Sequence, residues 1–261
     1  DLLLEALQLP DGSEILISAI TIPDMVRILE DHRLVPVPVD LEMDDLSLSE
    51  EGLRQACGPR TQAIVAAHLF GGRMAMEPII EFARRNDLLV IEDCAQAYDG
   101  GSYRGHHEAH VSMFSFGPIK TATALGGGLL RVRDPAVRER IRSLQAGYPT
   151  QSRWNFLRRT ATCSVLKLLS ARPIFAFLVF LSRLARVDYG RLVNSSAHGF
   201  AGRGFFQRIR RRPSAPLLAL LERRLKTFDH RRASRQAAHG ELLGRLLRSK
   251  IDCPGTRRSP H

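Results

Sequence analysis

Two segments of the chain place side chains that could do chemistry at the ends of apolar runs. The first, Leu88–Gln96, carries two neighbouring carboxylates, Glu92 and Asp93. The second, Ser112–Gly128, runs through apolar residues into Lys120 and then reaches three consecutive glycines. A lysine amine can bond covalently to an aldehyde, which arginine cannot do. A carboxylate can keep a pyridine nitrogen protonated, so that the ring accepts electrons. Such an acid and such a lysine are what a pyridoxal phosphate enzyme needs.

Both residues also have a simpler interpretation. Asp93 can be a helix cap or a turn residue, and Lys120 can be an exposed turn lysine. Lys120 is, however, the only lysine among residues 1–130. Its neighbours Phe114, Phe116 and Pro118 are not those of a solvated charged face. We therefore favour the cofactor interpretation for the pair.

The elements that must position these residues alternate along the first half of the chain. We expect strands and helices at these places: strands at 15–18, 35–40, 61–67, 88–92, 111–115 and 128–132, and helices at 23–33, 76–86 and 134–144. Apolar strands spaced by helices predict an α/β fold, with a mostly parallel sheet covered by helices on both faces. Pro36 and Pro38 cannot donate to a strand ladder, so their strand is expected at an edge. Ligands bind at the carboxyl ends of such strands, where Asp93 lies.

These motifs resemble those of a known family. The pattern Pro78-x-x-Glu-Phe-Ala through Val-Ile-Glu-Asp-x-Ala-Gln-Ala97, followed by Phe114-Ser-Phe-x-x-x-Lys120 and the glycine turn, closely resembles the DegT/StrS family of sugar aminotransferases. The stretch Arg60–Gly71 is similar to the same family. The resemblance implies the aspartate-aminotransferase-like fold (fold type I) and the cofactor pyridoxal 5'-phosphate.

The resemblance also implies a role for each residue of the site. Lys120 would be the lysine that binds the cofactor aldehyde, and Asp93 would pair with the pyridine nitrogen. Gln96 would approach the phenolic oxygen, and Ser115 would donate to the phosphate. Ala95 would be the small residue packed against one face of the ring.

Histidines and cysteines add further candidates. His68 follows a strand, where it can line the substrate site or be a satisfied strand-end histidine, and both interpretations stay open. His106–His110 contains metal-ligand types, but a polar hairpin is the simpler interpretation, and we expect no metal. The four cysteines form no C-x-x-C, so neither a zinc site nor a disulfide framework is indicated. We identify no signal peptide in the sequence and expect a cytoplasmic protein, with association with a membrane as the alternative that stays open.

Charge separates the chain into two halves. Residues 1–130 carry 20 acidic and 9 basic side chains, whereas residues 131–261 carry 7 acidic and 29 basic ones. Within the basic half, residues 160–187 are mostly apolar and are interrupted by single Lys and Arg residues. The uninterrupted apolar core of this segment, residues 174–181, is too short to span a bilayer. Residues 160–187 can form an in-plane membrane helix or a buried helical pair, and we favour the buried pair. No motif indicates nucleic-acid binding.

We divide the chain by these textures. Residues 1–135 would form the cofactor-binding α/β domain, and 136–212 a basic, apolar helical segment. Residues 213–250 would form a long helix that begins a small C-terminal domain, and 251–261 a disordered tail. The sequence opens in what resembles mid-helix, so we expect a fragment that lacks the native N-terminus and part of the C-terminal domain.

The function that the resemblance implies is transamination. An amino group, from glutamate by resemblance, would pass to a keto-sugar carried on a nucleotide, for surface polysaccharide or secondary-metabolite synthesis. The family also implies a homodimer. The alternative is a degenerate, non-catalytic member acting as a binding or membrane-surface protein, which three departures from the family support: Gly117 (usually His), Ile22 (usually aromatic) and Gly126 (usually Glu). A sugar dehydratase is disfavoured, because by resemblance those enzymes replace the lysine with histidine.

Overall fold

The structure is a computed structural model that describes residues 1–100, 102–184, 204–249 and 259–260. Its contacts divide the chain into two compact units. The first comprises residues 1–147 and 217–261, and the second comprises residues 148–216.

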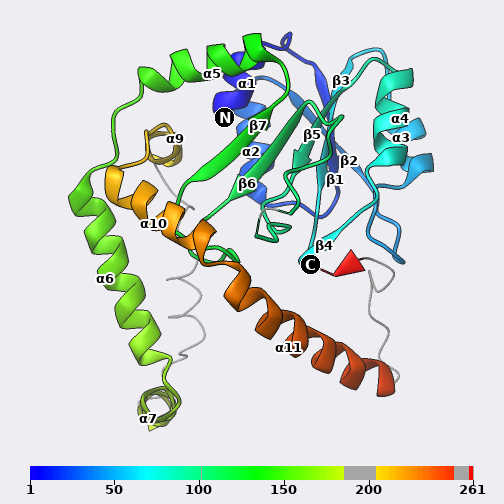
Figure 1. The fold of residues 1–261 in the computed structure, drawn as a ribbon. Helices are drawn as coiled ribbons and strands as arrows, with labels where there is room; N and C mark the ends of the chain where they lie inside the picture. The colour runs from blue at the N-terminus through cyan, green and yellow to red at the C-terminus, as the bar shows by residue number, and fades with distance from the viewer. Residues whose placement is uncertain (101, 185–203, 250–258, 261) are drawn as a thin grey trace. The chain divides into compact units, whose positions relative to one another are not determined.

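A six-stranded sheet forms the centre of the first unit (Figure 1). Its strands are β1 (Glu14–Ser18), β2 (Val35–Val39), β3 (Thr61–Ala67), β5 (Leu89–Asp93), β6 (Val111–Ser115) and β7 (Gly128–Val132). Their order across the sheet is β2-β1-β3-β5-β6-β7, and all neighbours are parallel except β6 and β7. The mostly parallel sheet is thus confirmed. The proline-containing β2 lies at an edge, as its missing N–H donors predict.

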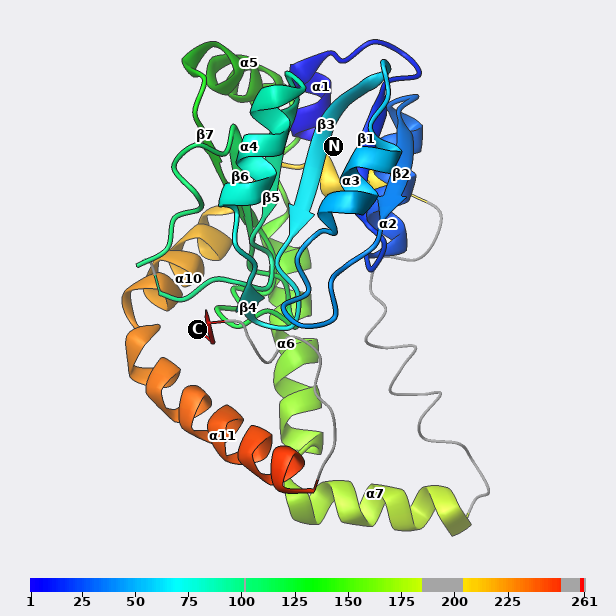
Figure 2. The same cartoon turned by 90° about the vertical axis from the view of Figure 1, so that its right-hand side faces the viewer.

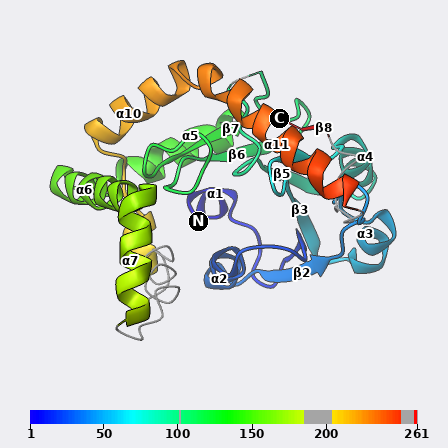
Figure 3. The ribbon, with the colours of Figure 1, turned by 90° about the horizontal axis from the view of Figure 1, so that it is seen from below.

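Helices cover both faces of this sheet, as Figure 3 shows. They are α1 (Leu2–Leu7), α2 (Pro23–Asp31), α3 (Glu50–Ala56), α4 (Glu77–Arg85) and α5 (Pro135–Ala146). Successive strand residues point to opposite faces, so Leu16 packs with the core under α3 and α4, while Ile15 and Ile17 pack with the core under α1, α2 and α5. The apolar strands predicted from the sequence therefore feed two cores, one on each face.

The C-terminal part of this unit differs from the long helix that we expected at 213–250. It forms two helices, α10 (Ala215–Lys226) and α11 (Asp229–Arg248), with a bend between them (Figure 2). The break falls at Thr227 and Phe228. The Thr227 hydroxyl donates to the Arg223 carbonyl at 2.9 Å, a contact that bends helices, and Phe228 is buried in a core cluster.

The expected disordered tail also needs a correction. Ser259–Pro260 form β8, which pairs antiparallel with β4 (Gly72–Arg73). The other residues of 251–261 lie outside the described part of the chain. Paired backbone groups on β4 give this short segment an extended conformation that its composition did not predict.

The second unit contains α6 (Arg153–Leu169), α7 (Arg172–Leu184) and α9 (Phe205–Ile209). Our preference for a buried pair at 160–187 is wrong for the side chains that the structure describes, because Phe175, Phe177 and Phe180 are all exposed. The chain turns sharply between α6 and α7, so the two helices diverge and cannot cover each other (Figure 2). Residues 185–187 lie outside the described residues.

Candidate active site at the carboxyl edge of the sheet

Three neighbouring strands bring the predicted residues to one edge of the sheet. Ala67 of β3 pairs with Asp93 of β5, and Asp93 pairs with Met113 of β6. All three strands run parallel, so their carboxyl ends lie side by side. His68 and Ser115 lie at the ends of the strands that flank Asp93. The edge is therefore the place where this fold class binds ligands.

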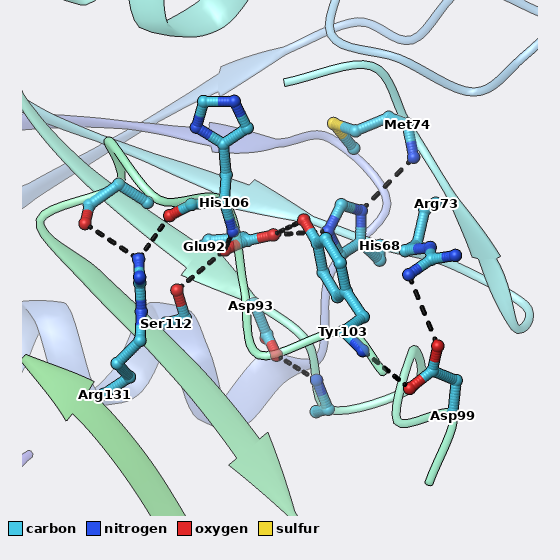
Figure 4. A network of polar contacts seen from close by, with 12 residues as sticks. His68, Arg73, Met74, Glu92, Asp93, Asp99, Tyr103, His106, Ser112 and Arg131 are labelled. Carbon is cyan, nitrogen blue, oxygen red and sulfur yellow. Dashed lines mark hydrogen bonds and ion pairs between the residues drawn. The ribbon is translucent and has the colours of Figure 1, made fainter. Parts of the chain in front are cut away.

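Glu92 lies at the centre of a buried hydrogen-bond cluster (Figure 4). Its carboxylate is fully buried and accepts from His68 Nε2 at 2.9 Å, the His106 backbone N–H at 2.8 Å and Ser112 Oγ at 2.7 Å. The Tyr103 hydroxyl donates a fourth hydrogen bond. Burial raises the pKa of Glu92, but the hydrogen bonds from His68, Tyr103 and Ser112 outweigh it and hold the pKa at about 2. The group is thus a satisfied carboxylate.

His68 is fixed on both sides of its ring. Its Nδ1 accepts from the Met74 backbone N–H at 3.3 Å. The ring proton is therefore on Nε2, which donates a hydrogen bond to Glu92. The side chain is buried. Of the two interpretations left open above, this geometry favours the satisfied strand-end histidine, because both ring nitrogens are occupied.

Tyr103 reaches Glu92 from a loop that is itself held in several places. Asp99, which is buried, accepts from the Tyr103 backbone N–H at 3.1 Å and also from Ser102 Oγ. The Arg73 guanidinium lies 3.5 Å from the Asp99 carboxylate and 4.3 Å from the Tyr103 ring centroid. These contacts order the loop between β5 and β6.

Glycine is required where this loop passes the cluster. Gly105 has φ +86, and a Cβ there would overlap the Ser112 side chain and approach Glu92 Oε2. A side chain at this position would therefore be strained and would also displace the donors to Glu92.

Asp93 has a different environment, although it is the next residue. Successive strand residues face opposite ways, and its carboxylate accepts from the Ala95 backbone N–H at 2.8 Å (Figure 4). Burial raises the pKa of Asp93, and the Ala95 N–H and the charges of Lys120 and His68 only partly oppose this. Asp93 is thus a desolvated acid whose ionised form would gain from a nearby cation.

Ser115 ends β6, and Lys120 lies in the turn that follows. The Lys120 backbone N–H donates to the Gly117 carbonyl at 3.1 Å, which closes a turn. A Cβ built on Gly117 would lie 3.9 Å from both Ser115 Oγ and Lys120 Cγ. Ser115 and Asp93 end neighbouring parallel strands, and the Lys120 charge acts against the rise in the pKa of Asp93, so the three predicted residues lie at the same edge of the sheet.

Gln96 and Ala95 lie in the turn after β5. Gln96 Oε1 accepts from the Phe70 backbone N–H at 3.0 Å, so its Nε2 is the group that can donate to a ligand oxygen. Ala95 is half-buried and adds only a methyl group beside Asp93.

An aromatic cluster that the sequence did not reveal joins the two loops. The Tyr98 ring lies edge-on to Phe114, Phe116 and Phe228, with centroid distances of 6.1, 5.4 and 5.1 Å. Leu221 of α10 is buried in the same cluster. The apolar residues around Lys120 indicated in part that Phe114 and Phe116 pack in a core. Phe228 could not be assigned to this cluster from the sequence, because it lies more than one hundred residues after Phe116 along the chain.

The two outer histidines of 106–110 hold backbone groups. His110 Nδ1 accepts from the Val90 backbone N–H at 3.0 Å, and burial lowers the pKa of His110, with the nearby Arg133 charge acting in the same direction. His106 Nδ1 accepts from the Glu108 backbone N–H at 3.3 Å, and the His106 backbone carbonyl accepts from the Arg131 guanidinium. These contacts give the segment a structural part in joining β5, β6 and β7.

Comparisons with known proteins show the family of the chain. Residues 1–167 match the model of the DegT/DnrJ/EryC1/StrS aminotransferase family. GDP-perosamine synthase of Escherichia coli O157:H7 is 32% identical over 142 residues, which are 53% of this chain and 39% of that protein. The erythromycin biosynthesis sensory transduction protein EryC1 of Saccharopolyspora erythraea is 36% identical over 149 residues, 56% of this chain and 40% of that one.

Solved structures show the same relationship. An aminotransferase from Psychrobacter cryohalolentis superposes with a TM-score of 0.52 at 26% identity, over 57% of this chain and 38% of that one. DesI, solved in the presence of its TDP-sugar product, superposes with a TM-score of 0.50 at 28% sequence identity, over 56% of this chain and 37% of that one. The chain thus spans about two fifths of the length of the curated relatives it matches. Because the family model covers more than half of the chain and the site motifs lie within that match, the chain belongs to the DegT/DnrJ/EryC1/StrS aminotransferase family.

Proposed function

We propose that the protein is a pyridoxal phosphate-dependent aminotransferase that places an amino group on a keto-sugar carried on a nucleotide. The observation that supports this proposal is that Asp93 and Ser115 end neighbouring parallel strands and that Lys120 lies in the turn that follows Ser115. Relatives named GDP-perosamine synthase, and DesI with its TDP-sugar product, support the nucleotide-sugar class. Glutamate as the donor and a homodimer are part of the same proposal.

The residues present fit the cofactor. Pyridoxal phosphate supplies, when bound, an electron sink beside the substrate carbon. Asp93 would hold its ring nitrogen, and a desolvated carboxylate with one backbone donor is suited to a cationic partner. Gln96 Nε2 would donate to the phenolic oxygen, Ser115 Oγ would donate to the phosphate, and the Ala95 methyl would leave room for one face of the ring.

Lys120 has two tasks in this proposal. Its amine holds the cofactor covalently before the donor arrives, and afterwards Nζ moves a proton between the substrate carbon and the cofactor carbon. Asp93 keeps the proton on the ring nitrogen during that transfer, because its charge stabilises the cationic form.

His68 and Glu92 act as positioning residues rather than as substrate ligands. Their hydrogen bond joins the ends of β3 and β5. This fixes the position of Asp93, the last residue of β5, and of the turn that carries Gln96. A role for His68 in substrate binding would require it to leave two hydrogen bonds and its buried position.

Borohydride labelling tests the proposal. The chain is incubated with pyridoxal phosphate, reduced, digested and mapped by mass spectrometry, with Lys120→Arg as the control that keeps the charge. We expect the label on Lys120 alone and an absorbance band from the bound cofactor. A label elsewhere, or none, would contradict the site.

Turnover separates the catalytic proposal from its alternative. Wild type loaded with pyridoxal phosphate and left unreduced should convert a nucleotide-linked keto-sugar to the amino-sugar with glutamate present. Cofactor bound at Lys120 without any amino-sugar product would instead favour the non-catalytic alternative, for which the exposed Ile22 in place of an aromatic residue is the supporting observation.

A further inference from the structure

The net positive charge of the chain is concentrated in the second unit. Residues 148–216 carry thirteen Lys and Arg side chains and a single acidic one, Asp188. Their net charge of +12 exceeds the +11 of the whole chain, so the remaining residues sum to −1. No acidic residue occurs between Arg153 and Leu184, the span of α6 and α7.

The apolar side chains of α6 form one stripe, and the stripe is exposed. Residues three or four apart share a helix face, and the stripe follows that spacing through Trp154, Leu157, Ala161, Val165 and Leu168. All five are exposed, with Trp154 at 71%.

The opposite face of α6 is the one that is covered. Phe156 is buried, and Thr160 and Cys163 are partly buried. At about 100° per residue these three lie across the helix from the stripe. The helix thus buries its more polar face and leaves its more apolar one outside, the reverse of what an amphipathic helix of a globular core does.

Helix α7 continues this apolar exposure. Phe177 and Phe180, which are also three residues apart, are 60% and 64% exposed. Arg172 begins the helix, and no charged residue follows until Arg183. Among the described helices, none combines the length and the apolar character needed to cross a membrane.

We propose that α6 and α7 lie in the plane of an anionic lipid surface, with the α6 stripe and the exposed phenylalanines of α7 inserted among the acyl chains. Apolar insertion and attraction of basic side chains to anionic headgroups are the two contributions that hold such helices at an interface. Arg158, at the margin of the stripe, and Arg172 are placed to meet the headgroups. This surface is independent of the proposed catalytic activity.

The single tryptophan of the chain makes the proposal measurable, because it belongs to the stripe. We expect Trp154 emission to shift to shorter wavelength when the full chain meets phosphatidylcholine vesicles containing roughly one third phosphatidylglycerol. Brominated lipids should quench it. Pure phosphatidylcholine should bind much more weakly, and salt should reverse the anionic binding.

Four substitutions test the two contributions. Phe177→Asp and Phe180→Asp should each reduce vesicle partitioning about tenfold, and Arg158→Glu combined with Arg172→Glu should reduce it to a similar extent by removing the attraction to anionic headgroups. The controls are Met43→Asp and Arg140→Glu, which make the same changes at exposed positions of the first unit and should leave binding unchanged. Circular dichroism of each variant checks that it is folded.

Each other outcome overturns the proposal. Unchanged Trp154 emission with anionic vesicles means that no lipid surface is bound. Emission that is already shifted without lipid, and that reverts on dilution as the mass falls by half, means that a second copy covers the stripe. Binding to an RNA oligonucleotide that competes with vesicles and ignores Phe177→Asp assigns the charge to nucleic acid. Unfolding of both phenylalanine variants means that α7 is core.

Discussion

The two units of the chain treat polar and apolar side chains in opposite ways. In the first unit, residues 1–147 and 217–261, the side chains of Glu92, His68 and Asp99 are buried, and each makes several hydrogen bonds. In residues 148–216, aromatic and aliphatic side chains of α6 and α7 lie in solvent.

The difference shows that residue type alone does not decide burial. Glu92 can be buried because four donors surround it, which removes the cost of desolvation. Phe177 stays exposed because the helix that carries it diverges from its neighbour and meets no opposing surface among the described residues. In the first unit a polar side chain should therefore matter most, whereas in the second an apolar one should matter little for stability.

The largest effect should come from Lys120. Lys120→Arg keeps the charge but removes the nucleophilic amine, so transamination should fall by about 10⁴-fold or more. The unfolding free energy without cofactor should stay within about 0.5 kcal/mol of wild type, because Lys120 is only half-buried and arginine keeps its charge. Lys167→Arg, in the second unit, is the matched control. Turnover of Lys120→Arg within tenfold of wild type would remove the lysine from the mechanism.

Asp93→Asn should separate chemistry from stability. The rate should fall by several orders of magnitude, because the amide cannot hold a protonated ring nitrogen; a loss below about tenfold, or ~1.4 kcal/mol, would exclude that role. The unliganded protein should be no less stable than wild type.

The pH dependence of Asp93 has a definite sign. Burial raises the pKa of Asp93 in the folded state, so ionisation is disfavoured there, and wild-type stability rises as the pH falls through the folded-state pKa. Asp93→Asn should remove this contribution in a series of denaturant titrations across acidic pH. An unchanged pH dependence would mean that the carboxylate is not desolvated.

Glu92→Gln should have the opposite signature. We expect a loss of about 3 kcal/mol of unfolding free energy at neutral pH, because an amide cannot accept from all four donors. The pKa of Glu92 is lowered from 4.5 to about 2, so its contribution is complete above pH 4.5 and is lost as the pH falls towards 2. Glu81→Gln, at an exposed site of α4, is the control. Equal stability of the Glu92 and Glu81 variants would show that the cluster does not stabilise the fold.

Phe177→Asp should change the unfolding free energy as little as Lys120→Arg does. A charged side chain at an exposed position should change the unfolding free energy by no more than about 0.5 kcal/mol, as measured by urea titration. A loss of several kcal/mol would break the contrast between the two units, since it would place Phe177 in a core.

Much of the fold followed from local patterns. Strand β6 has the predicted bounds, β5 differs by one residue at each end, and Pro36 and Pro38 placed β2 at the edge. These predictions were confirmed because they depend on properties of the local sequence, namely runs of apolar residues and prolines that lack an N–H donor.

Long-range contacts decided what the sequence did not show. The donors to Glu92 come from positions up to 24 residues away, and Tyr98 meets Phe228 from another part of the chain. The exposure of α7 could not be predicted either, because an apolar helix has the same sequence pattern whether or not another surface covers it.

The cluster around Glu92 also determines the alignment of β5. The residues before it, Leu88-Leu-Val-Ile91, are apolar on both faces, so a slip of one residue against β3 and β6 would cost little hydrophobic burial. Such a slip would turn Glu92 to the face that Asp93 now occupies. It would also leave His68, Tyr103 and Ser112 without their shared acceptor. The four hydrogen bonds therefore fix the register of β5, which its hydrophobic pattern does not determine. They also determine which of the two adjacent acids, Glu92 or Asp93, is available to a ligand at the carboxyl edge of the sheet.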